Sequence, residues 1–213
     1  MKTDDLVDML ARGMTAPEPI HPSARITAAI AWGIAGAALG MALLLGVRKD
    51  LVEAAALSMF WVKVFLPGSL AVIAFYAVRR LAIPGLSSAR ALSLLGLPIA
   101  LVSVLGLASY ASATAGERSG LLWGDTWYLC LICVPLLSVP LLVALFRVLK
   151  ELAPTRPMVT GAVAGLLAGA VSAAIYALHC PELAPPFIAV WYSLGMATTA
   201  LAGAFAGHYL LRW

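Results

Sequence analysis

The sequence predicts an all-α integral membrane protein with six transmembrane helices and a short cytoplasmic N-terminal tail. Three observations predict this class. Of the 213 residues, 62% are hydrophobic and 11% are charged, whereas a soluble domain carries about 25% charged residues. The mean hydropathy is +0.97, and six stretches stay apolar over the roughly 20 residues that cross a bilayer as a helix. Alternating segments of about ten residues, which are typical of membrane barrels, are absent from the sequence.

The predicted helices follow one another in a single bundle, residues 27–213. The first stretch carries no charged residue, and the second carries one, Lys63. The fourth contains Pro135 and Pro140, which a membrane helix tolerates where neighbouring groups satisfy the freed backbone. Residues 1–26 are left as the N-terminal tail. The expected helices cover residues 27–47, 54–78, 91–111, 127–146, 158–178 and 187–211.

The basic residues predict the orientation of the bundle. If the N-terminus is cytoplasmic, ten of the 14 Lys and Arg residues fall on the cytoplasmic side and three on the outer side, while Lys63 lies within a helix. Cytoplasmic segments of membrane proteins carry an excess of Lys and Arg. The sequence therefore predicts a multi-pass protein of the cytoplasmic membrane with both termini in the cytoplasm.

The tail has the pattern of a short amphipathic helix. Thr3 is a suitable N-cap, and acidic residues follow it in the first turn, where the helix dipole favours anions. An apolar face on so short a helix needs a cover, either a groove on a soluble partner or the membrane and the protein's own loops. The candidate partner-binding residues are Asp4, Asp5, Leu6, Met9 and Leu10.

The predicted topology brings two thiols to the outer membrane interface. Cys130 lies near the outer end of the fourth helix, and Cys180 follows the outer end of the fifth. Thiolate and imidazole groups bind soft metal ions, so Cys130, Cys180 and His179 are candidate ligands for a transient heavy-metal ion; the same thiols facing an oxidising compartment are a candidate disulfide. Cys133 and Glu182 are candidate auxiliary residues. No constitutive cofactor is expected.

Lys63 is the one ionisable residue deep within a predicted span. A lysine at the bilayer centre costs roughly 2.5–3.5 kcal/mol, which makes it a candidate functional residue. The alternative is that its ammonium group reaches an interface along its own stem. No predicted span contains a carboxylate to pair with it, which argues against a proton relay or an ion transporter.

Glycines four residues apart mark three of the predicted helices. Such stripes let helix backbones approach closely in a membrane. They suit either the seam of a homodimer or packing within the bundle, and we favour packing within the bundle for a six-helix chain. The stripes are Gly36 and Gly40, then Gly161, Gly165 and Gly169, then Gly203 and Gly207.

No catalytic motif is present, and the chain is not expected to be an enzyme. The alternative is a membrane thiol-disulfide oxidoreductase, because Cys130 and Cys133 have the spacing that such enzymes use and Cys180 is a candidate shuttle thiol. Against it, Cys133 lies deep among aliphatic residues.

Seven short strings, taken together, resemble the NrsF family of negative regulators of sigma F, which are membrane anti-sigma factors with six spans. The resemblance extends over essentially the whole chain. The strings are MKTDDLVD at 1–8, FWVK at 60–63, WYLC at 127–130, APTRP at 153–157, LHCPE at 178–182, AVWY at 189–192 and LLRW at 210–213.

This resemblance implies a bacterial inner-membrane protein that holds a cytoplasmic sigma factor of the extracytoplasmic-function class. It implies release of that sigma factor under heavy-metal or oxidative stress. The two sensing cysteines of the family map to Cys130, in the WYLC string, and to Cys180, in the LHCPE string. Such a protein acts through its sigma factor, so no direct contact with nucleic acid is expected.

Overall fold

The computed structural model describes residues 22–83 and 85–212, and this part of the chain contains helices and no strand. Six helical segments are long and apolar enough to cross a membrane, which confirms the predicted class of an all-helical fold with six such segments. The helices are α2 (Pro22–Leu44), α3 (Leu51–Ala55), α4 (Ser58–Ala82), α5 (Ala89–Leu94), α6 (Gly96–Ser112), α7 (Arg118–Trp123), α8 (Trp127–Glu151), α9 (Pro157–Tyr176), α10 (Pro185–Phe187), the π-helix η1 (Ile188–Tyr192) and α11 (Ser193–Leu210).

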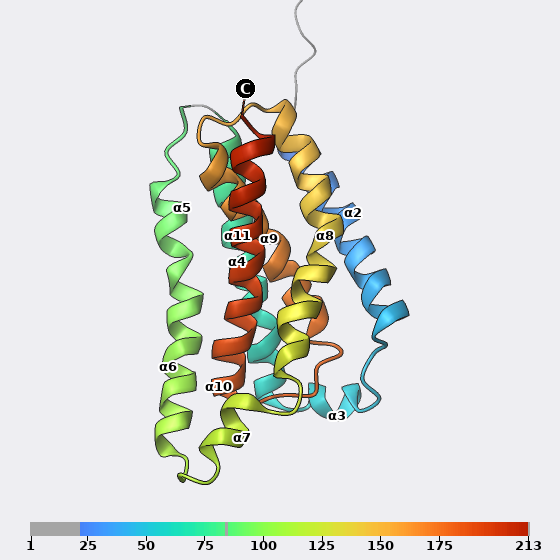
Figure 1. Ribbon diagram of the computed structural model, residues 1–213, viewed down its shortest axis with the longest axis vertical. Coiled ribbons are helices and arrows are strands. Elements are labelled where there is room, and N and C mark those ends of the chain that lie inside the picture. The colour runs from blue at the N-terminus through green and yellow to red at the C-terminus, as the bar shows by residue number, and fades with distance from the viewer. Residues whose placement is uncertain (1–21, 84, 213) are drawn as a thin grey trace, which may run out of the picture.

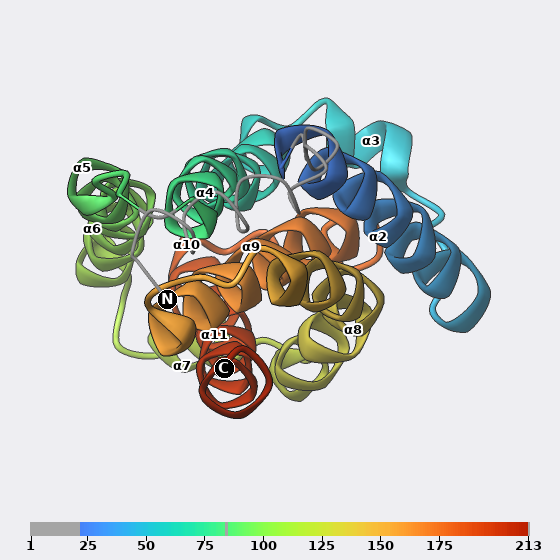
Figure 2. The ribbon, with the colours of Figure 1, turned by 90° about the horizontal axis from the view of Figure 1, so that it is seen from above.

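Helix α9 is the centre of the bundle. It packs against α4 on one side and against α8 and α11 on the other (Figure 2). Helix α2 covers α8, while α5 and α6 form one span that stands at the edge (Figure 1). Burial follows this order, because 61% of the α9 span is buried in the protein and only 17% of the α5–α6 span.

Glycine contacts bring α9 and α11 together. A Cβ atom on Gly161 would overlap the backbone oxygen of Gly203, and one on Gly165 would overlap that of Thr199. Only a residue without a side chain fits at such positions, since real Cβ atoms essentially never come within 3.0 Å of another heavy atom. These contacts confirm that the stripes on the fifth and sixth spans pack within the bundle.

The same principle joins α2 to α8, the helix that carries Cys130. A Cβ atom on Gly33 would clash with Leu141, and one on Gly36 would lie 3.0 Å from Pro140 Cβ. At the start of α2, Arg25 forms an ion pair with Glu151 at the end of α8. The two helices are therefore connected along much of their length.

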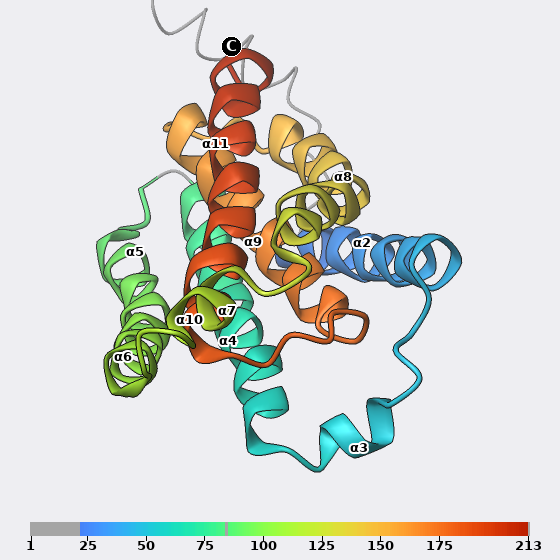
Figure 3. The same cartoon turned by 60° about the horizontal axis from the view of Figure 1, so that its bottom comes forward.

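The bundle has two distinct ends. The thiol end contains α3, α7, α10 and the loop 177–184 that follows α9 (Figure 3). The basic end contains the start of α2, the α4–α5 loop and the end of α11 (Figure 1). Each end has its own hydrophobic cluster, one around Cys130 and Cys180 and the other around Ile26 and Leu149. The tail residues Asp4, Asp5, Leu6, Met9 and Leu10 lie outside the described residues.

Candidate functional site

Two cysteines meet at the thiol end. Cys130 lies in the first turn of α8, and Cys180 lies in the loop after α9. They lie close together in one hydrophobic cluster, although 50 positions separate them in the sequence. Both residues are completely buried, and both are free thiols. The fold thus brings together the two residues that the sequence placed at one interface.

Cys133 belongs to the same hydrophobic cluster, one turn further along α8. It is also a free thiol and is 6% exposed. Its cluster also contains Cys180 and Tyr176, so its surroundings are not solely the aliphatic ones expected from its neighbours in the sequence.

Lys63 holds the loop that contains Cys180. Its side chain is fully buried, and its Nζ donates hydrogen bonds of 2.7 Å each to the backbone oxygens of Cys180 and Glu182. The ammonium group also lies 5.3 Å from the ring centroid of Tyr192, within the range of a cation–π interaction. Two carbonyl groups and an aromatic face therefore stabilise the charge of Lys63 in place of a carboxylate.

The segment between α2 and α3 holds the same loop from another side. Arg48 Nη1 donates to Cys180 O at 3.3 Å, and the guanidinium also forms a two-pronged ion pair with Asp50 at 2.8 and 2.5 Å. This pair lowers the pKa of the Asp50 carboxyl to about 2. His179 Nδ1 lies 2.9 Å from Gly46 O, and because a carbonyl only accepts, Nδ1 carries the proton.

Glu182 connects the loop to the start of α8. Its Oε1 accepts a 2.9 Å hydrogen bond from the backbone N–H of Asp125. The turn comes very close to this carboxylate at Gly124, which has a φ of +53° and where a Cβ atom would lie 2.8 Å from Glu182 Cδ. A glycine is therefore required by both the backbone conformation and the space.

Two tyrosines complete the surroundings of the thiols. Tyr176, at the end of α9, and Tyr192, in η1, are fully buried, and their rings lie 6.1 Å apart. Neither hydroxyl has a well-formed hydrogen bond to any described atom, although each lies near a cysteine thiol. Buried hydroxyl groups without partners are uncommon in folded proteins. A π-helix within a span, as at η1, is also frequent at functional sites.

The surroundings of Cys180 favour its ionised form. The thiol of Cys130 interacts with its sulfur, and the Lys63 ammonium group lies nearby, so both lower the pKa of Cys180 below its usual value against the effect of burial. Cys180 therefore lies in surroundings that favour a thiolate, with the Lys63 ammonium group nearby.

Metal-binding capacity at the thiol end rests on this pair of sulfurs. In the described part of the chain, no group of three or more His, Cys, Asp or Glu side chains is arranged to hold a metal ion. The ring of His179 is oriented by Gly46 through Nδ1, which leaves Nε2 as the nitrogen able to join a metal. The structure therefore brings together two donors, the thiols of Cys130 and Cys180, and does not group the His179 imidazole with them.

Three residues of this site, Arg48, Tyr176 and Tyr192, were not predicted from the sequence. The partners of Lys63 were not predicted either, because they are backbone carbonyls rather than a carboxylate. One signal was available, since the strings that contain Lys63 and Cys180 were both part of the family resemblance. Backbone carbonyls as partners have no signature in a sequence.

The fold and the site define an all-helical protein with six membrane-length helices and a buried pair of thiols at one end. A family model described as "Negative regulator of sigma F", NrsF, matches residues 10–213. The chain belongs to this family. No solved structure matches it.

Two named relatives match along the entire length of both chains. A protein of Azospira oryzae named "Probable anti-sigma-F factor NrsF" is 47% identical over 213 residues. A protein of Caulobacter vibrioides named "Anti-sigma-F factor NrsF" is 37% identical over 219 aligned residues. These names point to a regulatory role rather than to catalysis.

Proposed function

We propose that this chain is a membrane-bound anti-sigma factor that holds a sigma factor of the extracytoplasmic-function class. Its family and the names of both relatives support an anti-sigma role. Six helices of membrane length support a location in the bacterial inner membrane, where the lipid bilayer covers their exposed apolar faces. The sigma factor itself is soluble and cytoplasmic.

In this proposal the basic end faces the cytoplasm and the thiol end faces the periplasm. The distribution of charge supports it, because most described basic residues other than Lys63 lie at or near the basic end. The basic residues near the thiol end are Arg48, Lys49 and Arg118. Both chain termini are then cytoplasmic, and the tail residues Asp4, Asp5, Leu6, Met9 and Leu10 are available to bind the sigma factor.

The observation that carries the sensing role is the meeting of Cys130 and Cys180 in one buried site. A peroxide oxidises the two thiols to a disulfide; the thiols give up two protons and two electrons, and the peroxide becomes an alcohol and water. A soft cation such as Cd²⁺ instead replaces the thiol protons and binds both sulfurs. Glu182 supports the site from the loop. Cys133 lies one turn further along α8 and forms no bond in either reaction.

A bond between the two sulfurs changes the position of α8, and α8 transmits this change to α2, the helix that follows the tail. Cys130 is fixed to α8, and α8 contacts α2 through Leu141 and Pro140. The ion pair of Arg25 with Glu151 joins the same helices at the basic end, next to the tail. Moving the sigma factor from 99% bound to 99% released requires about 5.5 kcal/mol, which a disulfide or a two-sulfur metal bond is able to supply.

A transcription reporter driven by the sigma factor tests this proposal in cells. The double variant Cys130→Ser/Cys180→Ser should repress the reporter in unstressed cells, which shows that it folds, and should lose induction by Cd²⁺ and by a peroxide. The matched control is Cys133→Ser, which should keep induction. Normal induction in the double variant would remove the sensing role, and loss of induction in Cys133→Ser would instead favour the oxidoreductase.

A further inference from the structure

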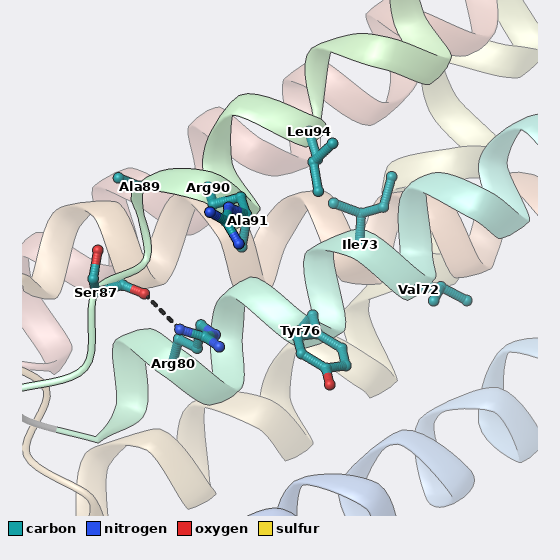
Figure 4. Close-up of a pocket in the computed structure, with 9 residues that line it drawn as sticks. All are labelled: Val72, Ile73, Tyr76, Arg80, Ser87, Ala89, Arg90, Ala91 and Leu94. Carbon is teal, nitrogen blue, oxygen red and sulfur yellow. Dashed lines mark hydrogen bonds between the residues drawn. The ribbon is translucent and has the colours of Figure 1, made fainter.

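A cavity of about 630 Å³ opens between α4 and α5 at the basic end. Its walls are of two kinds. Val72, Ile73 and Leu94 form an apolar part, with Ile73 and Leu94 on opposite sides of the gap between the two helices (Figure 4). Arg80 and Arg90 form a basic part nearer the α4–α5 loop. The cavity therefore combines an apolar wall with two positive charges.

The two arginines have no acidic partner among the described residues. The ion pairs found there join Arg25 to Glu151 and Arg48 to Asp50, which lie elsewhere. Arg80 Nη1 donates a 3.0 Å hydrogen bond to the backbone oxygen of Ser87, so its guanidinium is held in place at the cavity (Figure 4). Two like charges gathered at one cavity are stabilised by an anion.

Two smaller hollows increase the positive charge at this place. Both are lined by Arg80; one of about 500 Å³ also reaches Arg156, and one of about 210 Å³ also reaches Arg79. Arginine binds phosphate groups well because its planar guanidinium presents several donors at once. The chemistry of the rim thus suits a phosphate better than a single hydrogen-bonding group.

The depth of the apolar wall favours a ligand with a long apolar part. Val72 lies ten residues before the end of α4, and at about 1.5 Å per residue this is roughly 15 Å from the basic end. The α5–α6 span stands away from the bundle and does not fill the gap at this depth. A ligand that satisfies both parts carries its negative charge at one end and a hydrocarbon chain at the other.

We propose that this cavity binds an anionic phospholipid of the inner leaflet. Arg80 and Arg90 bind its phosphate, and an acyl chain lies along Val72, Ile73 and Leu94. Basic pockets between transmembrane helices on the cytoplasmic side are suited to anionic headgroups. The proposal rests on the membrane orientation given under the proposed function, and it is independent of the thiols.

Native mass spectrometry of the full-length protein in detergent tests the site. Phosphatidylglycerol and phosphatidylcholine with identical acyl chains are added in parallel to delipidated protein. We expect retention of phosphatidylglycerol over phosphatidylcholine. Each basic residue near a headgroup contributes roughly fivefold in affinity, so Arg80→Gln/Arg90→Gln should weaken phosphatidylglycerol binding about 25-fold.

The matched control removes the same charge at the thiol end. Lys49 and Arg118 line none of the cavities named above, and Lys49→Gln/Arg118→Gln should leave the binding within about twofold. Arg80→Lys/Arg90→Lys keeps the charge and should keep most of the binding. Equal losses in both Gln pairs, or equal retention of the two lipids, would overturn the proposal.

Two further variants distinguish the lipid site from the tail and from the thiols. Deletion of residues 1–21 should leave phosphatidylglycerol binding unchanged; if binding appears only after this deletion, the acidic tail is the occupant and the proposal is wrong. Cys130→Ser/Cys180→Ser should bind the lipid normally, which separates this site from thiol sensing. Labelling of Ser87→Cys by an impermeant maleimide from the cytoplasmic side alone is expected, and labelling from the periplasm would refute the orientation itself.

Discussion

The α9 span and the α5–α6 span differ sharply in how they pack against the rest of the bundle. Helix α9 is 61% buried and contacts α11 so closely that backbone lies against backbone at Gly161 and Gly165. The α5–α6 span is 17% buried and leaves a cavity beside α4. Since lipid is as apolar as a leucine side chain, close contact rather than hydrophobicity decides which helices stay together. The comparison shows that α9 organises the bundle and that α5–α6 faces its surroundings.

Polar groups follow the same division. Around the end of α9, the ammonium group of Lys63 and the guanidinium of Arg48 both donate to the carbonyl of Cys180. Lys63 and Cys180 are fully buried. Beside α5, Arg80 and Arg90 are exposed and have no acidic partner in the described chain. A buried network with every member in contact responds as a unit when one bond changes, whereas exposed charges are free to meet a ligand.

The largest expected effect comes from filling the closest helix contact. Gly165→Leu would force α9 and α11 apart, because even a Cβ atom meets the backbone oxygen of Thr199. We expect a loss of at least about 3 kcal/mol or no folded protein. Gly96→Leu, at the start of α6, meets nothing within 4 Å and should change stability by less than about 1 kcal/mol. Thermal unfolding in detergent measures both, and equal effects would contradict the comparison.

The second effect concerns two cations that lie over aromatic rings. Lys63→Met removes two hydrogen bonds from a charged donor, and we expect a cost of about 2 kcal/mol after the relief of its buried charge. Arg118 lies 5.4 Å from the ring centroid of Tyr110 and is only partly buried. Arg118→Met should cost less than about 1 kcal/mol. Comparable melting temperatures for the two variants would show that Lys63 does not hold the loop of Cys180.

A third test compares the accessibility of thiols at the same end of the bundle. N-ethylmaleimide should label the native protein at least about tenfold more slowly than the variant Ser112→Cys, because the native thiols are buried and residue 112 is exposed. Mass spectrometry counts the labels, and all cysteines should react after denaturation. Rapid labelling of Cys130 or Cys180 in the folded protein would mean that the site is open.

The smallest expected effect compares two carboxylates that accept backbone N–H groups. Glu182→Ala removes the contact with Asp125 in the closely packed site and should cost about 1 kcal/mol. Glu117 bonds Thr114 on the surface beside α7, and these bonds lower the pKa of its carboxyl. Its contribution is therefore present near neutral pH and is lost as the pH falls through the lowered pKa. Glu117→Ala should have a smaller effect than Glu182→Ala in the same unfolding assay at pH 7.

The class of fold and part of the site were predictable from the sequence. Hydrophobic stretches identified six membrane-length helices. The glycine spacing predicted close packing within the bundle, and the structure shows that α9 and α11 are the helices that meet at these glycines. Topology placed Cys130 and Cys180 at one interface, but their contact depends on how the loop 177–184 folds back over α4. That path is set by backbone oxygens bound to Lys63 and Arg48, and backbone oxygens are the same in every sequence. The cavity beside α5 exists because α5 and α4 do not pack closely there, and no residue pattern in the sequence predicts such a gap.

The central claim is that joining Cys130 to Cys180 releases the sigma factor, and one co-purification measures it directly. The full-length protein is captured from cells with its sigma factor and treated with a peroxide; the disulfide is then assigned by peptide mass spectrometry and the bound sigma factor is quantified. We predict a Cys130–Cys180 disulfide together with loss of most of the sigma factor, and retention of the sigma factor by Cys130→Ser/Cys180→Ser. A wild-type protein that carries this disulfide and still holds its sigma factor would contradict the account.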